Sequence, residues 1–225
     1  MAEKLIELIN NSNDTNKKLE SEDFLVKELV SDNGFMVFSK NEIYNLKEIS
    51  NFNLKYLFAK YPYKHRYFAS YKLNNNCKTL VYILYNPSYA NPENNDDTIE
   101  NCIKLAKKSG YGVVEIINLF SLRTPNPSKH YLKSTNAINK EFIINYLTQL
   151  NNIENKDVVF AWGHGKENDS YCKNLIEEIE TILKDKPTFV IGVNPEVVNK
   201  INHHPDKRVW NGLGGFENLA TLIKR

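Results

Sequence analysis

The chain has 225 residues, of which 41% are hydrophobic and 25% charged, a composition ordinary for a globular protein with one buried core. Its 29 Lys and Arg residues against 27 Asp and Glu residues give a formal net charge of +2. So small a net charge excludes a protein that holds nucleic acid by overall charge alone, although it leaves room for a local basic face.

The three cysteines cannot form a complete disulfide set, and none of them lies in a CxxC pair. Cys102 and Cys172 fall on stripes with helical spacing, so both are predicted to be small buried hydrophobic side chains. The N-terminus lacks the apolar core of a signal peptide, and no apolar run approaches the ~20 residues that a membrane span requires. These features predict a cytoplasmic protein that does not enter a membrane.

Residues 1–60 are rich in Asn, Lys and Glu and contain only short amphipathic pieces. Gly34-Phe-Met-Val-Phe38 is consistent with a strand, and the Asn-rich segment 10–16 is a loop signal. We therefore expect an N-terminal extension over residues 1–60, packed on a core domain formed by residues 61–225.

From residue 66 onward, strand and helix patterns alternate. Runs rich in β-branched and aromatic residues predict strands at 66–73, 79–85, 113–117, 157–162 and 188–192. Helices are predicted at 97–109, 139–151 and 170–184, with a last short helix from residue 216. Asp97 is typical of a helix N-cap, and Gly110 of the left-handed residue that ends the same helix.

Alternation of the last four strands with helices implies a parallel sheet with right-handed crossovers. The strands are apolar along their whole length, which favours burial by helices on both faces. The predicted fold class is therefore a three-layer α/β/α arrangement with a central, mainly four-stranded parallel sheet.

Polar side chains follow the carboxyl ends of these strands, and open α/β sheets bind ligands at that edge. The successive strand ends carry Asn86-Pro87-Ser88, Asn118 with Arg123 after it, Trp162-Gly163-His164, and later His203-His204-Pro205. Side-chain amides both donate and accept hydrogen bonds, which suits them to reading a nucleobase edge or holding a water molecule.

Each of these residues also has an ordinary structural interpretation. Asn86 before a proline and Asn118 after a strand are frequent turn formers. His164 fits a solvated loop, and Trp162 fits core packing. No GxSxG, Walker A or GxGxxG motif is present, and His203-His204 lacks the spacing of a zinc site, so neither metal nor cofactor is expected.

Six short blocks occur in a distinctive order over about residues 66–205. They are Arg66-Tyr67, Leu84-Tyr-Asn-Pro-Ser88, Asn95-Asp-Asp-Thr98, Asn118-Leu-Phe120 with Thr124-x-x-Pro127, Ala161-Trp-Gly163 and His204-Pro205. On these blocks the chain resembles the family called domain of unknown function 1643, a name that implies no activity.

The order of blocks also resembles, more distantly, the uracil-DNA glycosylase superfamily, which has a four-stranded parallel sheet between helices. This resemblance implies that Asn86 positions the attacking water and that Asn118 hydrogen-bonds a flipped base. It further implies that His204 reaches a carbonyl oxygen of the base, and it makes Tyr89 or Phe120 the aromatic side chain that stacks on it. Unlike that superfamily, the chain has no glycine directly before its Asn-Pro motif.

These roles imply a metal-independent DNA glycosylase acting on a deaminated or modified base. The catalytic residues expected from them are Asn86 and His204. The expected substrate-binding residues are Pro87, Ser88, Tyr89, Asn118, Phe120, Arg123, Trp162, His164 and Pro205. Loops expected to face DNA phosphates carry Arg123, Lys129, His130, Lys207 and Arg208.

Two other functions fit the same sequence. One is a non-catalytic module that binds nucleotides or nucleic acid. The other is a hydrolase of free nucleosides or nucleotides, which the near-neutral charge favours. The oligomeric state does not follow from the sequence.

Overall fold

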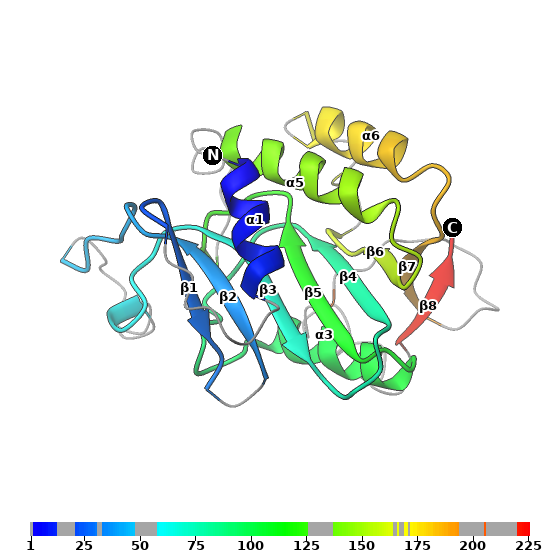
Figure 1. Cartoon of the computed structure of the whole chain (residues 1–225), viewed down its shortest axis with the longest axis horizontal. Coiled ribbons are helices and arrows are strands. Elements are labelled where there is room, and N and C mark those ends of the chain that lie inside the picture. Colours follow the sequence, from blue (N-terminus) through cyan, green and yellow to red (C-terminus); the bar gives the residue numbers. More distant parts are fainter. Residues whose placement is uncertain are drawn as a thin grey trace.

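The structure is a computed structural model that describes residues 2–12, 21–30, 33–47, 58–125, 137–163, 166, 169–170, 172–193, 205 and 220–225. Within these residues the chain forms one eight-stranded mixed sheet and four helices (Figure 1). None of the described helices is long and apolar enough to cross a membrane.

The elements follow the predicted alternation closely. The strands are β1 (Phe24–Glu28), β2 (Asn33–Ser39), β3 (Arg66–Lys72), β4 (Thr79–Leu84), β5 (Val113–Asn118), β6 (Lys156–Phe160), β7 (Thr188–Val193) and β8 (Ala220–Lys224). The helices are α1 (Ala2–Ser12), α3 (Asp97–Lys108), α5 (Ala137–Leu150) and α6 (Lys173–Ile182).

The sheet has the strand order β1-β2-β3-β5-β4-β6-β7-β8. Strands β5, β4, β6 and β7 are parallel, as predicted, but antiparallel pairings join β1 to β2, β2 to β3, β3 to β5 and β7 to β8. The prediction of a sheet with mainly four parallel strands is therefore wrong in the number of strands. The four parallel strands form only the middle of a larger, mainly antiparallel sheet.

Two segments account for this difference. Residues 1–60 contribute β1 and β2, which extend the sheet next to β3. At the other edge, a helix was predicted from residue 216, but Ala220–Lys224 forms strand β8 beside β7. β-branched Thr221 and Ile223 favour a strand conformation. The segment therefore pairs with the edge of β7 as a strand.

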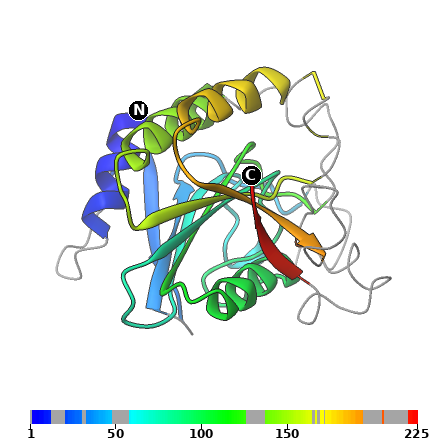
Figure 2. The same ribbon diagram turned by 90° about the vertical axis from the view of Figure 1, so that its right-hand side faces the viewer.

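Helices cover both faces of the sheet. Apolar residues of α1, α5 and α6 form one core cluster with one face, whereas α3 forms a second cluster with the other face. Figure 2 shows α5 and α6 above the sheet and α3 below it. Side chains on a given strand therefore point alternately toward α3 and toward the three-helix layer.

The N-cap of α3 differs from the prediction by one residue. Asp96, rather than Asp97, is the N-cap, and its Oδ1 accepts a hydrogen bond from the backbone N–H of Ile99 at 3.0 Å. Gly110 follows the helix with φ of +82°, as expected for a residue that ends a helix in the left-handed conformation. The capping fixes where the preceding loop enters the helix.

A buried ion pair lies on the face covered by α5. Glu115 in β5 is 3% exposed and accepts hydrogen bonds from Lys156 Nζ, at 2.7 Å from its Oε2, and from the Tyr146 hydroxyl. Burial, followed by the charge of Glu115, raises the pKa of Tyr146 well above its usual value. The carboxylate is thus fully paired, which makes this cluster part of the core.

Replacing Lys156 with Met should leave the buried carboxyl group of Glu115 without its cation, with only the Tyr146 hydroxyl as a side-chain donor. We expect Lys156→Met to lower the free energy of unfolding by about 3 kcal/mol. Lys140→Met is the matched control, because Lys140 pairs with Glu178 at 2.8 Å with both side chains largely exposed, and it should cost less than about 1 kcal/mol. Equal losses in urea unfolding followed by circular dichroism would contradict the buried role of Glu115.

Candidate functional site

The carboxyl ends of β4 and β5 lie side by side. Leu84 pairs with Asn118 in the parallel register. Beyond the strands, the backbone N–H of Leu119 donates to the Leu84 carbonyl at 2.8 Å, and that of Phe120 to the Tyr85 carbonyl at 3.0 Å. Because this pairing continues past the strand ends, it fixes the positions at which Asn86 and Asn118 leave the sheet.

Asn86 is half-buried and has an oriented side chain. Its Nδ2 donates to the carbonyl of Pro87 at 2.9 Å and to the carbonyl of Thr124 at 2.8 Å. These bonds use both N–H donors of the amide and leave Oδ1 as an acceptor. The arrangement suits an acceptor that holds a water molecule in a set position.

Asn118 is 1% exposed, and neither Oδ1 nor Nδ2 of its side chain has a hydrogen-bond partner. It continues the alternation of Val114 and Ile116, which pack toward α3, so its side chain points to the same face. A buried amide without partners costs about 1–3 kcal/mol. Such a group is therefore a strong candidate for one that a ligand or ordered water completes.

Arg66 is a second buried group of this kind, and the sequence analysis missed it as a site residue. It lies opposite Phe38 in the register and therefore faces α3, is 1% exposed, and has no partner for Nε or Nη1. Burial lowers the pKa of Arg66, against smaller opposing effects of Tyr71 and Asp96. One feature of the sequence could have identified Arg66 as a site residue. It is an arginine at the first position of a strand whose residues are otherwise buried on both faces of the sheet.

Arg123 is fully buried, so it does not face solvent phosphates as the sequence analysis expected. Its Nη1 donates to the carbonyls of Tyr61 at 2.8 Å and Tyr63 at 2.9 Å. Its Nη2 donates to the carbonyls of Tyr89 and Ala90, each at 3.3 Å. Arg123 therefore ties two loops together at the strand ends.

The predicted residues of the Asn-Pro loop lie at this edge with unequal exposure. Pro87 is buried, whereas Ser88 and Tyr89 are half-buried. The backbone of this loop is held on both sides, because the Pro87 carbonyl accepts from the backbone N–H of Thr124 at 2.9 Å. The loop is thus a supported part of the edge.

Two predicted aromatic residues lie on the opposite face of the sheet. Phe120 contacts Tyr85 edge to face at 5.2 Å between ring centroids, and Trp162 stacks on Phe160 at 4.7 Å. All four belong to the cluster covered by α1, α5 and α6. The structure therefore does not place Phe120 or Trp162 beside the Asn118 side chain.

Pro205 is buried against α3, where its carbonyl accepts a hydrogen bond from Asn101 Nδ2 at 2.7 Å. This contact brings the C-terminal part of the chain to the helix on the face toward which Asn118 points. The other predicted residues of the loops, His164, His204, Lys129, His130, Lys207 and Arg208, lie outside the described residues.

A row of Ser121, His65 and Glu42 lies near the same edge. Nδ1 of His65 lies 2.9 Å from Ser121 Oγ, and its Nε2 lies 3.4 Å from Glu42 Oε2, an ion-pair distance without the alignment of a hydrogen bond. The order resembles a Ser-His-carboxylate triad, but the imidazole is reversed, because Nδ1 rather than Nε2 faces the serine. Ser121 Oγ is also bonded within the protein, to His65 and to the Tyr67 hydroxyl, so we assign the row to structure.

His65 should make the protein sensitive to acid. Burial lowers its pKa from 6.5, an effect that Glu42 only partly opposes. The unfolded chain binds a proton here near pH 6.5 and the folded protein only at lower pH, so stability is lost as the pH falls below about 6.5. Between about pH 7.5 and 5.5, wild type should lose more free energy of unfolding than His65→Gln; parallel losses would contradict this role.

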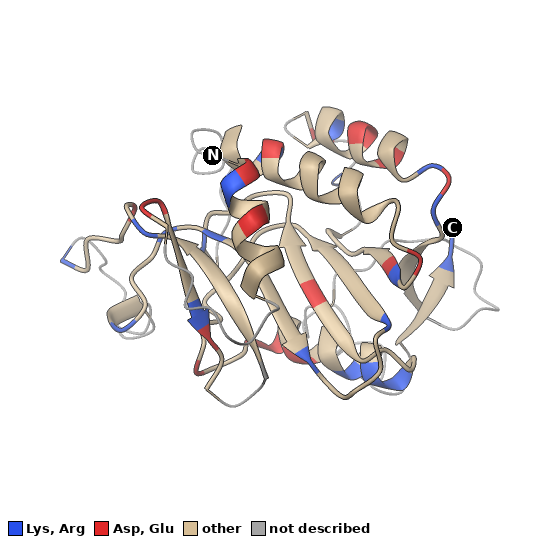
Figure 3. Ribbon diagram, in the orientation of Figure 1, with Lys and Arg blue, Asp and Glu red and all other residues tan. Residues whose placement is uncertain are grey.

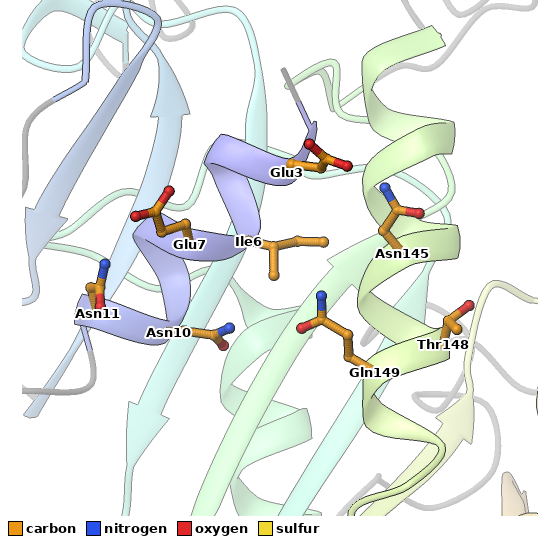
Figure 4. Close-up of a pocket in the computed structure, with 8 residues that line it drawn as sticks. All are labelled: Glu3, Ile6, Glu7, Asn10, Asn11, Asn145, Thr148 and Gln149. Atoms are coloured by element: carbon orange, nitrogen blue, oxygen red, sulfur yellow. The ribbon is translucent and has the colours of Figure 1, made fainter.

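A separate open groove of about 530 Å³ lies between α1 and α5 (Figure 4). These helices cover the face of the sheet opposite to the Asn118 side chain. Its lining is mostly acidic and amide side chains: Glu3, Ile6, Glu7, Asn10, Asn11, Asn145, Thr148 and Gln149. None of the predicted site residues lines it, so we do not include it in the candidate site.

Two buried asparagines offer a direct test of the unpaired state of Asn118. Asn139 is fully buried like Asn118, but its Nδ2 donates to the carbonyls of Asn118 and Leu119, each at 3.0 Å. We expect Asn139→Leu to lower the free energy of unfolding by about 1–3 kcal/mol, because two buried carbonyls lose their donor. Asn118→Leu should leave stability unchanged or raise it, since it removes an unpaired amide. Chemical denaturation of both variants measures the difference, and an equal loss would show that Asn118 is paired.

Comparison with known proteins identifies a family but no characterised relative. The family model described as "Protein of unknown function (DUF1643)" matches residues 66–206, more than half of the chain. No curated protein and no solved structure matches. The matched segment begins at the first residue of β3 and contains Arg66, Asn86, Asn118 and Pro205. The chain therefore belongs to the DUF1643 family.

Proposed function

We propose that the protein is a metal-independent DNA glycosylase-like enzyme that hydrolyses the N-glycosidic bond of a deaminated or modified base. The observation that carries this proposal is the buried, unpaired amide of Asn118, which lies on the strand next to β4, the strand that Asn86 follows. A buried amide completed by a ligand is what recognition of a nucleobase edge requires.

The two asparagines have different tasks in this reaction. Asn118 offers one acceptor and two donors to a base that has left the duplex stack, a step that costs least at a damaged or mismatched pair. Asn86 offers Oδ1 to the attacking water, and its own N–H groups are already occupied by two carbonyls. An amide is too weak a base to deprotonate water, so Asn86 acts by positioning it near the anomeric carbon.

Bond cleavage leaves positive charge on the sugar and negative charge on the base. Donors directed at the base carbonyl oxygen stabilise that negative charge, and a single preorganised donor can contribute about 3 kcal/mol. His204 is the donor expected from the resemblance to uracil-DNA glycosylases. The contact of Pro205 with Asn101 supports this part of the proposal, because it holds Pro205, the residue after His204 in the sequence, against the helix on the Asn118 face.

The arrangement of the sheet also supports the proposal. Four central strands are parallel and have helices on both faces, which agrees with the four-stranded parallel sheet between helices of the uracil-DNA glycosylase superfamily. The finer description of the fold, a three-layer arrangement of that type with added antiparallel strands, is part of this proposal.

A hydrolase of free nucleosides or nucleotides is the second candidate. Figure 3 shows Lys and Arg interspersed with Asp and Glu over the described elements, and the formal net charge is only +2. The electrostatic field of such a protein attracts a polyanion such as DNA only weakly, which favours a small substrate. Activity on DNA should fall steeply between about 50 and 200 mM salt, whereas activity on a free nucleoside should not.

Base release from DNA tests the proposal directly. We expect wild type to produce abasic sites in at least one duplex of a panel that carries uracil and other deaminated or modified bases. Asn86→Ala should slow this release about 100-fold, because the water loses its fixed position. Asn145→Ala, the same substitution in the groove between α1 and α5, is the control and should leave the rate unchanged.

Two results would contradict the proposal. One is the absence of abasic sites in every duplex of the panel. The other is release by Asn86→Ala at the wild-type rate. If base is released only from free nucleosides, the second candidate function is the correct one.

A further inference from the structure

Arg66 carries a buried positive charge for which the described residues provide no ion-pair partner. It is 1% exposed, and Nε and Nη1 have no hydrogen-bond partner. In the part of the chain that the structure describes, no carboxylate lies within ion-pair distance of it. Because an unpaired charge in a protein core is strongly unfavourable, a group of this kind requires a function or a missing partner.

Arg66 and Asn118 lie on adjacent strands and on the same face. Strand β3 is antiparallel to β5, with Ala69 opposite Ile116, and the backbone N–H of Arg66 donates to the Ser121 carbonyl at 2.9 Å. Burial lowers the pKa of Arg66, and Tyr71 and Asp96, which oppose this effect, are both on the α3 side of the sheet.

Arg123 shows what a structural arginine looks like in the same region. It donates to four backbone carbonyls, and burial together with the charge of Arg66 lowers its pKa to about 9. Asp96 caps α3 through its Oδ1 and raises the pKa of Arg66, but it does not lie within ion-pair distance of Arg66. Two buried guanidinium groups thus repel each other, and only one of them is satisfied by the protein.

We infer that Arg66 supplies the positive charge that stabilises the departing base, next to the amide of Asn118, whereas the donor expected at His204 supplies a hydrogen bond. This inference rests on the proposed function. A guanidinium has donors but no acceptor, so its partner on the base must be a carbonyl oxygen, not an amino group. The substrate is therefore a base with a carbonyl acceptor that can carry the negative charge.

The reaction balances without a further reactant. The water oxygen bonds to the anomeric carbon as the C–N glycosidic bond breaks, and the electron pair of that bond goes to the base. The base leaves as an anion paired with Arg66, and one proton of the water passes to solvent. The base then takes a proton from solvent, so the products are an abasic deoxyribose and the neutral base.

Leaving-group acidity separates this role from a structural one. Single-turnover release is measured for a substrate base and for its analogue with an electron-withdrawing substituent, such as uracil and 5-fluorouracil. Arg66→Gln should slow release of the parent base by about 10²- to 10³-fold, and less for the analogue, whose anion needs less stabilisation. Arg66→Lys should restore part of the rate, because it keeps the charge but loses the planar pair of donors.

The pH profile gives an independent readout. An arginine titrates far above a histidine even where burial lowers its pKa, so wild-type release should not decline as the pH rises from about 6 to 8. A decline as the pH rises through about 6.5 would assign the charge to a histidine and would overturn the role of Arg66.

Stability measurements in the absence of substrate complete the test. Arg66→Gln should unfold at the same or a higher denaturant concentration than wild type, whereas Arg123→Gln should unfold at a lower one. Equal destabilisation by the two substitutions would make Arg66 structural and overturn the inference. Base release that survives Arg66→Gln overturns the inference alone, whereas wild type that releases no base overturns the proposed function as well.

Discussion

The parallel pairing of β4 with β5 is the constraint on which the candidate site depends. Leu84 and Asn118 are partners, and the backbone bonds continue from Leu119 to Leu84 and from Phe120 to Tyr85. A shift of one residue would turn Asn118 to the other face, because side chains alternate along a strand. The register therefore decides whether the amide of Asn118 faces α3 and Arg66 or the layer of α5.

Buried polar groups divide this sheet into two regions of different character. In the middle of β5, Glu115 is matched by Lys156 and Tyr146. At the carboxyl end, Asn118 and Arg66 are buried on the opposite face without such partners. Proteins rarely retain unpaired buried polar groups unless those groups serve a function. We therefore assign the paired group around Glu115 to the stability of the fold, and the unpaired Asn118 and Arg66 to ligand binding.

The order and type of most elements could be predicted from the sequence, because hydrophobic periodicity and turn residues are local signals. Gly110 and the strand from Thr79 to Leu84 are examples. The segment Ala220–Lys224 could not, since its strand conformation comes from the exposed edge of β7 and outweighs local preference. The same holds for β1 and β2, which read as parts of an extension until their pairing with β3 is known.

The sequence by itself determined that asparagines follow two consecutive parallel strands, so that both reach one edge of the sheet. Only the tertiary structure decided which face each side chain occupies and whether it finds a partner there. In the folded chain Arg123 donates to four carbonyls, whereas Arg66 and Asn118 are buried without such partners. Phe120 lies on the face of the sheet opposite to the Asn118 side chain. The reason is physical: local patterns fix the conformation of a segment, whereas burial and pairing depend on contacts between residues far apart in the chain.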